Sequence, residues 1–408
     1  MGFSFAFYFQ LIYNRVMKSL SKFLLLSAVC AGMIMSVGCG NKKEYTFYTN
    51  MPDSDYKILD KSYKSGGFIE GFTPADTDYE AIDTSAYRQK YDYFYAMATT
   101  AQLVVYSDFS TTESEANYSN LSRAVMAKLY AIEKAVSSTV TDSDIYNFNN
   151  AAAGAKLEIS RIAYEVLTEA KATYEFTDGY YNPALYYNVQ AYGFGGAQDF
   201  EFPKKTSDLP DNAIIAKYTE LSTHFGDILL TEEEGKYFVT KPEYTVEVGG
   251  ETVSMKLDLG GIGKGYAVDC VDALLDEYGF DFGYFSFGTS SMLVKNNLGN
   301  GNFNLGLASP RSNTREPYLS TTIRNEKLST SGDNENRYFV DGVRYCHIID
   351  PTTGKPVQNG IMSVTVIGGG AAEDDALTTA IMCMGKDRAI QFIEEKLSDR
   401  RVIFTYGA

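Results

Sequence analysis

Tryptophan is absent from this sequence, histidine occurs twice and cysteine five times, and each shortage excludes a class of site. Two histidines, His224 and His347, are too few for a histidine-rich zinc centre. The cysteines of the main body are Cys270, Cys346 and Cys383, which form neither a C-x-x-C pair nor an even disulfide framework. Any bound metal must therefore be held by oxygen atoms, which favours Mg²⁺ or Ca²⁺.

Positive charge is scarce as well. Lysine and arginine number 36 against 52 aspartates and glutamates, so the formal net charge is −16 at pH 7. This balance argues against a nucleic-acid-binding protein, which needs a basic surface, and against adsorption to anionic lipid. The length of 408 residues and the hydrophobic content of 45% suffice for one large domain or two average ones.

What is present at the N-terminus has the pattern of a leader for export. In residues 1–39, Lys18 and Lys22 precede an apolar run that ends just before Cys39. A cysteine after a small residue at this point resembles a lipoprotein processing site, so we expect a lipid on Cys39 and a location on the extracytoplasmic face of the membrane. A plain cleaved signal and an uncleaved anchor are the alternatives. Met17 begins a conventional leader and is a second candidate for the start of the protein.

Beyond the leader, composition divides the chain into two parts. Residues 40–90 are polar and poor in aliphatic side chains, which suits a tether, and residues 91–408 have the pattern of a single globular domain. Apolar spacing predicts helices over 113–137, 160–177, 267–278 and 374–384, strands over 96–106, 282–294, 302–309 and 363–367, and a hairpin over 337–350 that turns at Asp341-Gly342. Mixed strands and helices without regular βαβ alternation favour an α+β fold, with antiparallel or mixed sheets flanked by helices.

The most informative stretch is KLDLGGIGKGYAVD, residues 256–269. Alternating apolar residues up to Leu257 predict a strand before it, and the helix that follows has a natural stop at Gly279. Four glycines and Lys264 lie between the two elements. A glycine loop that opens a helix presents free N–H groups and the positive helix end to an anion. Neither the Walker A pattern nor the dinucleotide fingerprint fits these glycines.

The neighbouring carboxylate, Asp258, narrows the choice of anion. A carboxylate, a bare loop and a lysine so close together suit a phosphate whose charge is shared with a metal. The alternative is a tight turn in which the glycines only supply positive φ angles.

Oxygen ligands for such a metal occur near the C-terminus. Asp375 and Thr379 are four residues apart on an expected helix, so their oxygens share one face, and Thr378 can add a third oxygen. With a backbone carbonyl from the glycine loop, these groups predict a Mg²⁺ site. The alternative is that Asp374 and Asp375 simply cap the start of the helix.

His347 is the candidate proton acceptor. It belongs to an expected strand beside Cys346, and it precedes a rigid turn over residues 350–354. A neutral imidazole there can take a proton from a hydroxyl group at neutral pH. A purely structural role is the alternative.

Several spaced motifs resemble the FAD:protein FMN transferase family (ApbE-type flavin transferases). They are DLGGIGKGYAVD at 258–269, LSTSGD at 328–333, HIIDPTTGKPV at 347–357 and DALTTAIMCMG at 375–385. The earlier stretches AMATTAQLVVY, SSTVTDSDI and FTDGYYNPALYYNVQAYGFG fit the family in the same order, so the resemblance runs from about Tyr91 to the C-terminus.

The resemblance implies an enzyme that uses Mg²⁺ and cleaves the diphosphate of FAD. It implies transfer of FMN to a Thr or Ser of a partner protein that carries an Asp-x-x-Ser/Thr motif, with release of AMP. The roles it implies are FAD contacts for Asp258 and Lys264, Mg²⁺ ligation for Gly261, Asp375, Thr378 and Thr379, flavin or adenine contacts for Met97, Thr139, Tyr180, Tyr181, Asn182 and Ile349, and base catalysis for His347.

Two departures from the family pattern keep alternatives open. Thr139 occupies a position where an aromatic side chain often packs on the cofactor, and Asn182 replaces the usual Asp. A weaker hold on the cofactor would let water compete with the acceptor, so hydrolysis of FAD to FMN and AMP is the alternative activity. A flavin-binding lipoprotein without catalysis and a solute-binding lipoprotein are alternatives from other classes, and the second leaves the glycine loop unexplained.

Overall fold

The structure is a computed structural model that describes residues 46–60, 64–65, 84–196, 202–298, 301–312 and 316–407. All of them belong to one unit, Glu44–Ala408. The expected leader, Cys39 and the second candidate start lie outside the described residues. Within the described ranges, no helix combines the length and the apolar character needed to cross a membrane.

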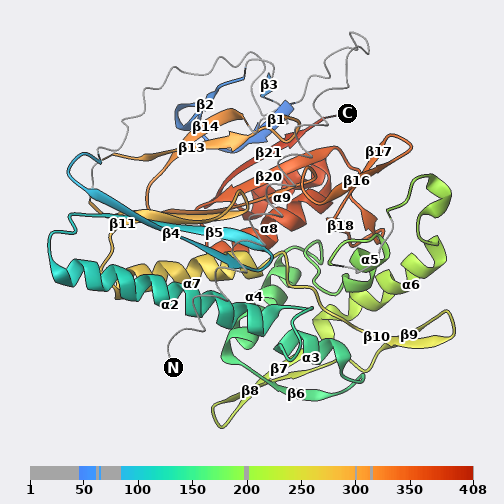
Figure 1. The fold of residues 1–408 in the computed structure, drawn as a ribbon. Coiled ribbons are helices and arrows are strands. Elements are labelled where there is room, and N and C mark those ends of the chain that lie inside the picture. The colour runs from blue at the N-terminus through green and yellow to red at the C-terminus, as the bar shows by residue number, and fades with distance from the viewer. Residues whose placement is uncertain are drawn as a thin grey trace, which may run out of the picture. The chain divides into compact units, whose positions relative to one another are not determined.

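A nine-stranded sheet forms the centre of the unit (Figure 1), with the strand order β3-β1-β21-β20-β15-β12-β11-β5-β4. Its pairs are antiparallel except for β1 with β3. The strands are β1 (Thr46–Thr49), β3 (Lys64–Ser65), β4 (Arg88–Ala96), β5 (Thr99–Ser107), β11 (Phe282–Phe287), β12 (Ser291–Asn296), β15 (Glu326–Gly332), β20 (Ile361–Ile367) and β21 (Arg401–Tyr406).

Two layers cover this sheet (Figure 1). Helices α2 (Thr112–Val136), α7 (Gly263–Glu277) and α8 (Ala371–Met384) pack on one face, around a core that includes Leu103, Leu121 and Leu377. A small sheet of β13 (Phe303–Ala308), β14 (Pro317–Ile323) and β2 (Tyr56–Ile58) covers the other face, over a second core that includes Leu319 and Ile403.

Further helices and small sheets complete the unit. They are α3 (Asp144–Asn150), α4 (Arg161–Phe176), α5 (Tyr186–Ala191), α6 (Asn212–Ser222), α9 (Lys386–Lys396), the sheet of β6 (Lys156–Ile159), β7 (Leu229–Glu233) and β8 (Lys236–Thr240), and the two-stranded pairs β9 (Thr245–Val248) with β10 (Glu251–Ser254), β16 (Arg337–Val340) with β17 (Val343–Cys346), and β18 (Ile349–Asp350) with β19 (Lys355–Pro356).

The expected α+β fold with antiparallel sheets and flanking helices is confirmed. Helix α2 matches the prediction over 113–137. Helix α4 matches the one over 160–177, where the Ser160 hydroxyl caps the first turn by accepting from Ala163 N at 3.1 Å. The expected hairpin also turns at Asp341-Gly342, where both residues have positive φ. The sequence predicts these three elements correctly because capping or turn residues occur at the ends of the segments that have the apolar pattern.

Three strand predictions need correction. The strand over 96–106 begins only at Thr99, because Met97 and Ala98 have positive φ and form the turn between β4 and β5. The strand over 282–294 is the hairpin of β11 and β12, and the strand before the glycine loop ends at Ser254. Helix α3 was not predicted in the polar stretch over 137–150.

The tether over 40–90 is corrected in its described parts. Strand β1 pairs with β21, β2 pairs with β14, and β4 starts at Arg88. Phe47 and Tyr56 are buried there. The segment therefore supplies strands and core residues to the folded body.

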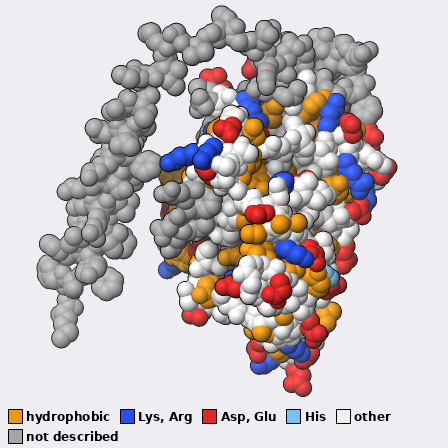
Figure 2. All heavy atoms as spheres, turned by 90° about the vertical axis from the view of Figure 1, so that its right-hand side faces the viewer, with side chains coloured by type: hydrophobic (Ala, Val, Ile, Leu, Met, Phe, Trp, Pro, Cys, Tyr) orange, Lys and Arg blue, Asp and Glu red, His pale blue; other side chains and the backbone are white. Residues whose placement is uncertain are grey.

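The surface agrees with the charge balance of the sequence. Figure 2 shows the right-hand side of the view in Figure 1. Basic side chains appear there only in small groups among acidic and hydrophobic ones, and acidic side chains project at the lower tip.

Asn149 provides a test of how the fold positions the glycine loop. Its side chain is 4% exposed and bonds to both the N–H and the C=O of Leu257. We expect Asn149→Ala to lower the free energy of unfolding by about 2 kcal/mol, because two buried backbone groups lose their partner. Urea unfolding measures this loss. The exposed neighbour Asn147 is the control, and an equal loss in Asn147→Ala would contradict the assignment.

Candidate active site

The segment that leads into the glycine loop is held by side chains and turns instead of a sheet. Leu257 N donates to Asn149 Oδ1 at 2.7 Å, and Asn149 Nδ2 donates to Leu257 O at 2.9 Å. Asp258 N donates to the carbonyl oxygen of Pro183 at 2.9 Å. Met255 and Leu257 are fully buried. The alternating apolar pattern thus marks an extended, buried segment that is held without strand pairing.

Helices α7 and α8 meet at their first turns. Gly265 N in α7 donates to Asp375 Oδ2 in α8 at 3.0 Å. A Cβ atom on Gly265 would lie 2.0 Å from the carbonyl oxygen of Ala371, so only glycine permits this approach. The glycine at this position of the loop therefore serves helix packing, and its N–H binds the carboxylate of Asp375.

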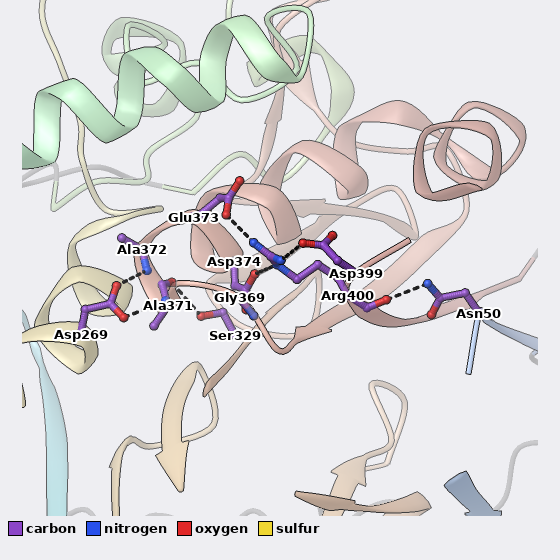
Figure 3. Close-up of polar contacts among 10 residues, drawn as sticks. All are labelled: Asn50, Asp269, Ser329, Gly369, Ala371, Ala372, Glu373, Asp374, Asp399 and Arg400. Atoms are coloured by element: carbon purple, nitrogen blue, oxygen red, sulfur yellow. Dashed lines mark hydrogen bonds and ion pairs between the residues drawn. The ribbon is translucent and has the colours of Figure 1, made fainter. Parts of the chain in front are cut away.

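A second set of hydrogen bonds runs in the opposite direction. Asp269 in α7 accepts from Ala371 N at 3.0 Å and from Ala372 N at 2.9 Å, as Figure 3 shows. Neither helix has a side-chain cap from the residue that precedes it. Each helix thus receives a carboxylate from the other one.

The contact between the helices gathers oxygen atoms around Gly261. A Cβ on this glycine would lie 3.2 Å from Thr379 Oγ1 and 3.6 Å from Tyr181 Cε2. Thr378 Oγ1 donates to the carbonyl oxygen of Asp375 at 2.7 Å and is hydrogen-bonded to Ser331 Oγ at 2.8 Å. Thr379 is thus the threonine that faces the glycine loop, whereas Thr378 is engaged with strand β15.

Burial makes this oxygen cluster electrostatically unfavourable for negative charge. Asp375 is 2% exposed, and burial raises the pKa of its carboxyl group against the opposing effects of Lys264 and the Gly265 N–H. Burial likewise raises the pKa of Asp258, against the Gly260 N–H and Lys264. Lys264 Nζ donates to the carbonyl oxygen of Gly260 at 3.0 Å. Lys264 thus opposes the raised pKa of both carboxyl groups, and a divalent cation would also favour the ionised form of both.

A buried polar atom without a partner and the set of nearby oxygen atoms show whether the site fits a metal ion and a ligand. The hydroxyl group of Tyr181 is buried and has no hydrogen-bond partner in the described ranges. Burial raises its pKa well above the ordinary value, and Asp375 and Asp258 add to this effect. No group of three or more His, Cys, Asp or Glu side chains suited to a metal occurs among the described residues. An ion here would therefore be held by one carboxylate together with hydroxyl and carbonyl oxygens, a set that suits Mg²⁺.

His347 lies just beyond strand β17, which ends at Cys346, so its expected place inside a strand is corrected. Its N–H donates to the carbonyl oxygen of Asn336 at 3.2 Å, and its ring nitrogen Nδ1 is buried without a partner in the described ranges. Burial lowers the pKa of His347 to about 4, and Lys264 adds to the shift while Glu335 opposes it. The imidazole is therefore neutral at physiological pH and lies within electrostatic range of the glycine loop.

Met97, Tyr180 and Ile349 are three of the residues expected to contact the flavin or the adenine. Met97 Sδ lies 3.8 Å from the place of a Cβ on Gly263, at the start of α7. The guanidinium of Arg388 lies over the ring of Tyr180, at 5.5 Å from its centroid. Ile349 is buried among aromatic residues that include Tyr192.

Asn182 and Thr139 belong to turns. Asn182 Nδ2 donates to the carbonyl oxygen of Ser222 at 3.1 Å, and its Oδ1 accepts from Ala184 N at 3.0 Å. Thr139 follows α2, and its N–H donates to Ser137 Oγ at 3.2 Å. Of the expected site residues, the structure thus gathers Gly261, Asp375, Thr379 and Tyr181 directly and places Asp258, Lys264 and His347 within electrostatic range of them. Met97 lies beside Gly263 and Thr378 beside Ser331, whereas the contacts of Thr139, Tyr180, Asn182 and Ile349 described above are with other residues.

Sequence reasoning did not single out three residues that build the site. Ser331 and Asp269 belong to the motifs LSTSGD and DLGGIGKGYAVD, so a signal existed, but neither residue has a partner nearby in the sequence. Asn149 is one of several asparagines in a polar stretch, and only its contact with Leu257 distinguishes it.

The comparisons with known proteins agree with one another. The profile of the ApbE family matches residues 97–404. The FAD:protein FMN transferase of Klebsiella pneumoniae is 27% identical over 283 residues, which cover 69% of this chain and 76% of that protein. The FAD:protein FMN transferase of Treponema pallidum is 28% identical over 279 residues, which cover 66% of this chain and 73% of that protein.

Solved structures show the same fold at low identity. The ApbE protein of Thermotoga maritima superposes with a TM-score of 0.63 at 23% identity, over 78% of this chain and 94% of that one. The flavin transferase ApbE of Vibrio cholerae superposes with a TM-score of 0.60 at 23% identity, over 78% of this chain and 97% of that one.

The backbone contact at Gly265 predicts the effect of a methyl group. We expect Gly265→Ala to lower the free energy of unfolding by about 3 kcal/mol, because the new Cβ must push α8 away from α7. Gly226 is the control, since a Cβ there meets Tyr174 at an ordinary 3.6 Å. Urea unfolding of both variants measures the difference, and equal losses would contradict the close approach.

The lowered pKa of His347 predicts a pH dependence of stability. Between about pH 4 and 6.5 the unfolded chain binds a proton at this histidine and the folded chain does not, so the free energy of unfolding falls as the pH is lowered. We expect His347→Gln to remove part of this fall. His224, which bonds to Asp227, is the control. Urea unfolding at several pH values measures it, and a fall of unchanged size in His347→Gln would refute the burial of a neutral imidazole.

Proposed function

The chain belongs to the ApbE family, and we propose that it is an FAD:protein FMN transferase that uses Mg²⁺. The reaction moves FMN from FAD onto a Thr or Ser of a partner protein and releases AMP. The FAD:protein FMN transferases of Klebsiella pneumoniae and Treponema pallidum support this activity through their similarity along most of the chain.

One observation carries the proposal, namely that the glycine loop and helix α8 meet. Gly261 lies against Thr379, and Gly265 donates to Asp375, although more than 100 residues separate these positions along the chain. Asp375, Thr379 and the carbonyl oxygen of Gly261 would hold the Mg²⁺, with Thr378 behind them on Ser331. When bound, Mg²⁺ polarises a phosphoryl oxygen and offsets the charge that develops in the transition state.

Residues of the chain itself bind the diphosphate and accept the proton. Lys264, at the positive N-terminal end of α7, binds the diphosphate and orients it for attack. His347 takes the proton of the acceptor hydroxyl at Nε2, because Nδ1 is buried. Burial lowers its pKa to about 4, so the ring is neutral at physiological pH, the form in which an imidazole accepts a proton, although it is a weaker base than an exposed imidazole.

The proposal also names the acceptor of the FMN group and the location of the enzyme. We propose that the acceptor is another protein with an Asp-x-x-Ser/Thr motif, and that the enzyme is exported and carries a lipid on Cys39. The leader pattern over residues 1–39 supports export.

Product analysis tests the activity. The purified protein with FAD, Mg²⁺ and an acceptor domain that carries the motif is expected to give a fluorescent protein band and AMP. We expect Asp375→Asn to lower the rate about 100-fold, because the only carboxylate of the metal site is lost. Asp387→Asn, at an exposed position of α9, is the control and should keep the rate.

Two outcomes would contradict the transferase. Release of AMP without a fluorescent band would show an FAD pyrophosphatase, as the Thr139 departure allows. Retention of intact FAD without AMP would show a flavin-binding lipoprotein that does not catalyse.

A further inference from the structure

Asp269 supplies the cap that helix α8 lacks. The residue before α8 is Gly370, which has no side chain to accept from the first turn. Asp269 reaches across from α7 and accepts from Ala371 N at 3.0 Å and from Ala372 N at 2.9 Å, as Figure 3 shows. The first N–H groups of a helix have no partner within the helix, so this carboxylate fixes where α8 begins.

The position of that first turn determines the position of the metal ligands. Asp375 lies one turn after Ala371 and Thr379 lies one turn further, on the same face of α8. A helix moves as a rigid rod over such a length, so a shift of its first turn displaces both oxygens relative to Gly261. Asp269 itself is four residues after Gly265, which donates to Asp375.

Asp269 is itself held in place from the sheet. Lys327 Nζ in β15 donates to Asp269 Oδ1 at 2.8 Å and lies 3.0 Å from Asp272 Oδ2. The same strand carries Ser331, which is hydrogen-bonded to Thr378. Strand β15 therefore holds both Asp269, which caps α8, and Thr378 in the middle of α8.

A second anchor holds the other side of the same turn. Asp374, which is fully buried, accepts from Gly369 N at 3.0 Å and from Arg400 Nε at 3.2 Å. Arg400 Nη2 also donates to Glu373 Oε2 at 2.6 Å (Figure 3). With this side fixed by Arg400, loss of Asp269 would tilt the first turn of α8 without detaching the helix.

We propose that Asp269 is a positioning residue for the divalent cation. It does not touch the ion, and its carboxylate holds the oxygens of Asp375 and Thr379 at the distance from Gly261 that the ion requires. The inference rests on the metal site of the proposed function. Groups that orient metal ligands in this way typically change metal affinity by about 10- to 100-fold when they are removed.

A Mn²⁺ titration followed by electron paramagnetic resonance measures the effect without turnover. We expect Asp269→Ala to weaken Mn²⁺ binding at least about 10-fold relative to the wild type. In assays of FAD cleavage, excess Mg²⁺ should restore most of kcat, because the ligands themselves remain. Asp272→Ala is the matched control, since it removes a carboxylate from the same Lys327 and leaves the cap intact.

Hydrogen exchange separates the cap from a general loss of structure. In Asp269→Ala, the amides of residues 371 and 372 should lose protection, while those of β15 keep it. Should this variant not fold, Asp269→Asn keeps one acceptor oxygen, and we expect about threefold weaker Mn²⁺ binding.

Each failure points to a different conclusion. A folded Asp269→Ala variant that binds Mn²⁺ as tightly as the wild type, or an Asp272→Ala variant that binds as weakly as Asp269→Ala, would overturn the role of Asp269 alone. A wild type that binds no Mn²⁺ would overturn the metal site, and with it both this inference and the proposed use of Mg²⁺.

Discussion

The exchange of hydrogen bonds between α7 and α8 is the constraint on which the site depends. Each helix starts without a side-chain cap of its own, and each receives a carboxylate from the other, Asp375 for α7 and Asp269 for α8. The backbones meet so closely at Gly265 that any side chain would separate them. Two motifs that are distant in the sequence thereby become one surface, with Lys264 and the N-terminal end of α7 on one side and hard oxygen atoms on the other.

The electrostatics of this surface follow from its burial. Asp258 and Asp375 are both disfavoured as anions, Lys264 is shared between them, and the neutral His347 adds no charge. A divalent cation would stabilise such a cluster and, in the proposed function, would bind the diphosphate. The hydroxyl group of Tyr181, whose ring lies beside Gly261, has no hydrogen-bond partner among the described residues and would gain one from a ligand.

Sequence reasoning identified the parts whose signals are local. The glycine loop, the i, i+4 pair of Asp375 and Thr379, and the caps of α4 are each encoded within a few residues. The contacts that join them are not local. Asn149 with Leu257, Ser331 with Thr378, and Asp269 with Ala371 depend on how distant segments pack. The turn at Met97-Ala98 also lacks the glycine that usually marks positive φ, so the strand over 96–106 is expected to begin three residues before β5 does.

Strand β1 has a consequence for how far the enzyme can reach. It begins at Thr46, seven residues after Cys39, and its pairing with β21 makes it part of the main sheet. If Cys39 carries the proposed lipid, a fully extended chain holds Thr46, where the folded body begins, within about 25 Å of the bilayer surface. The short linker would then restrict the enzyme to acceptor hydroxyl groups near the membrane, within the linker length plus the dimensions of the folded body.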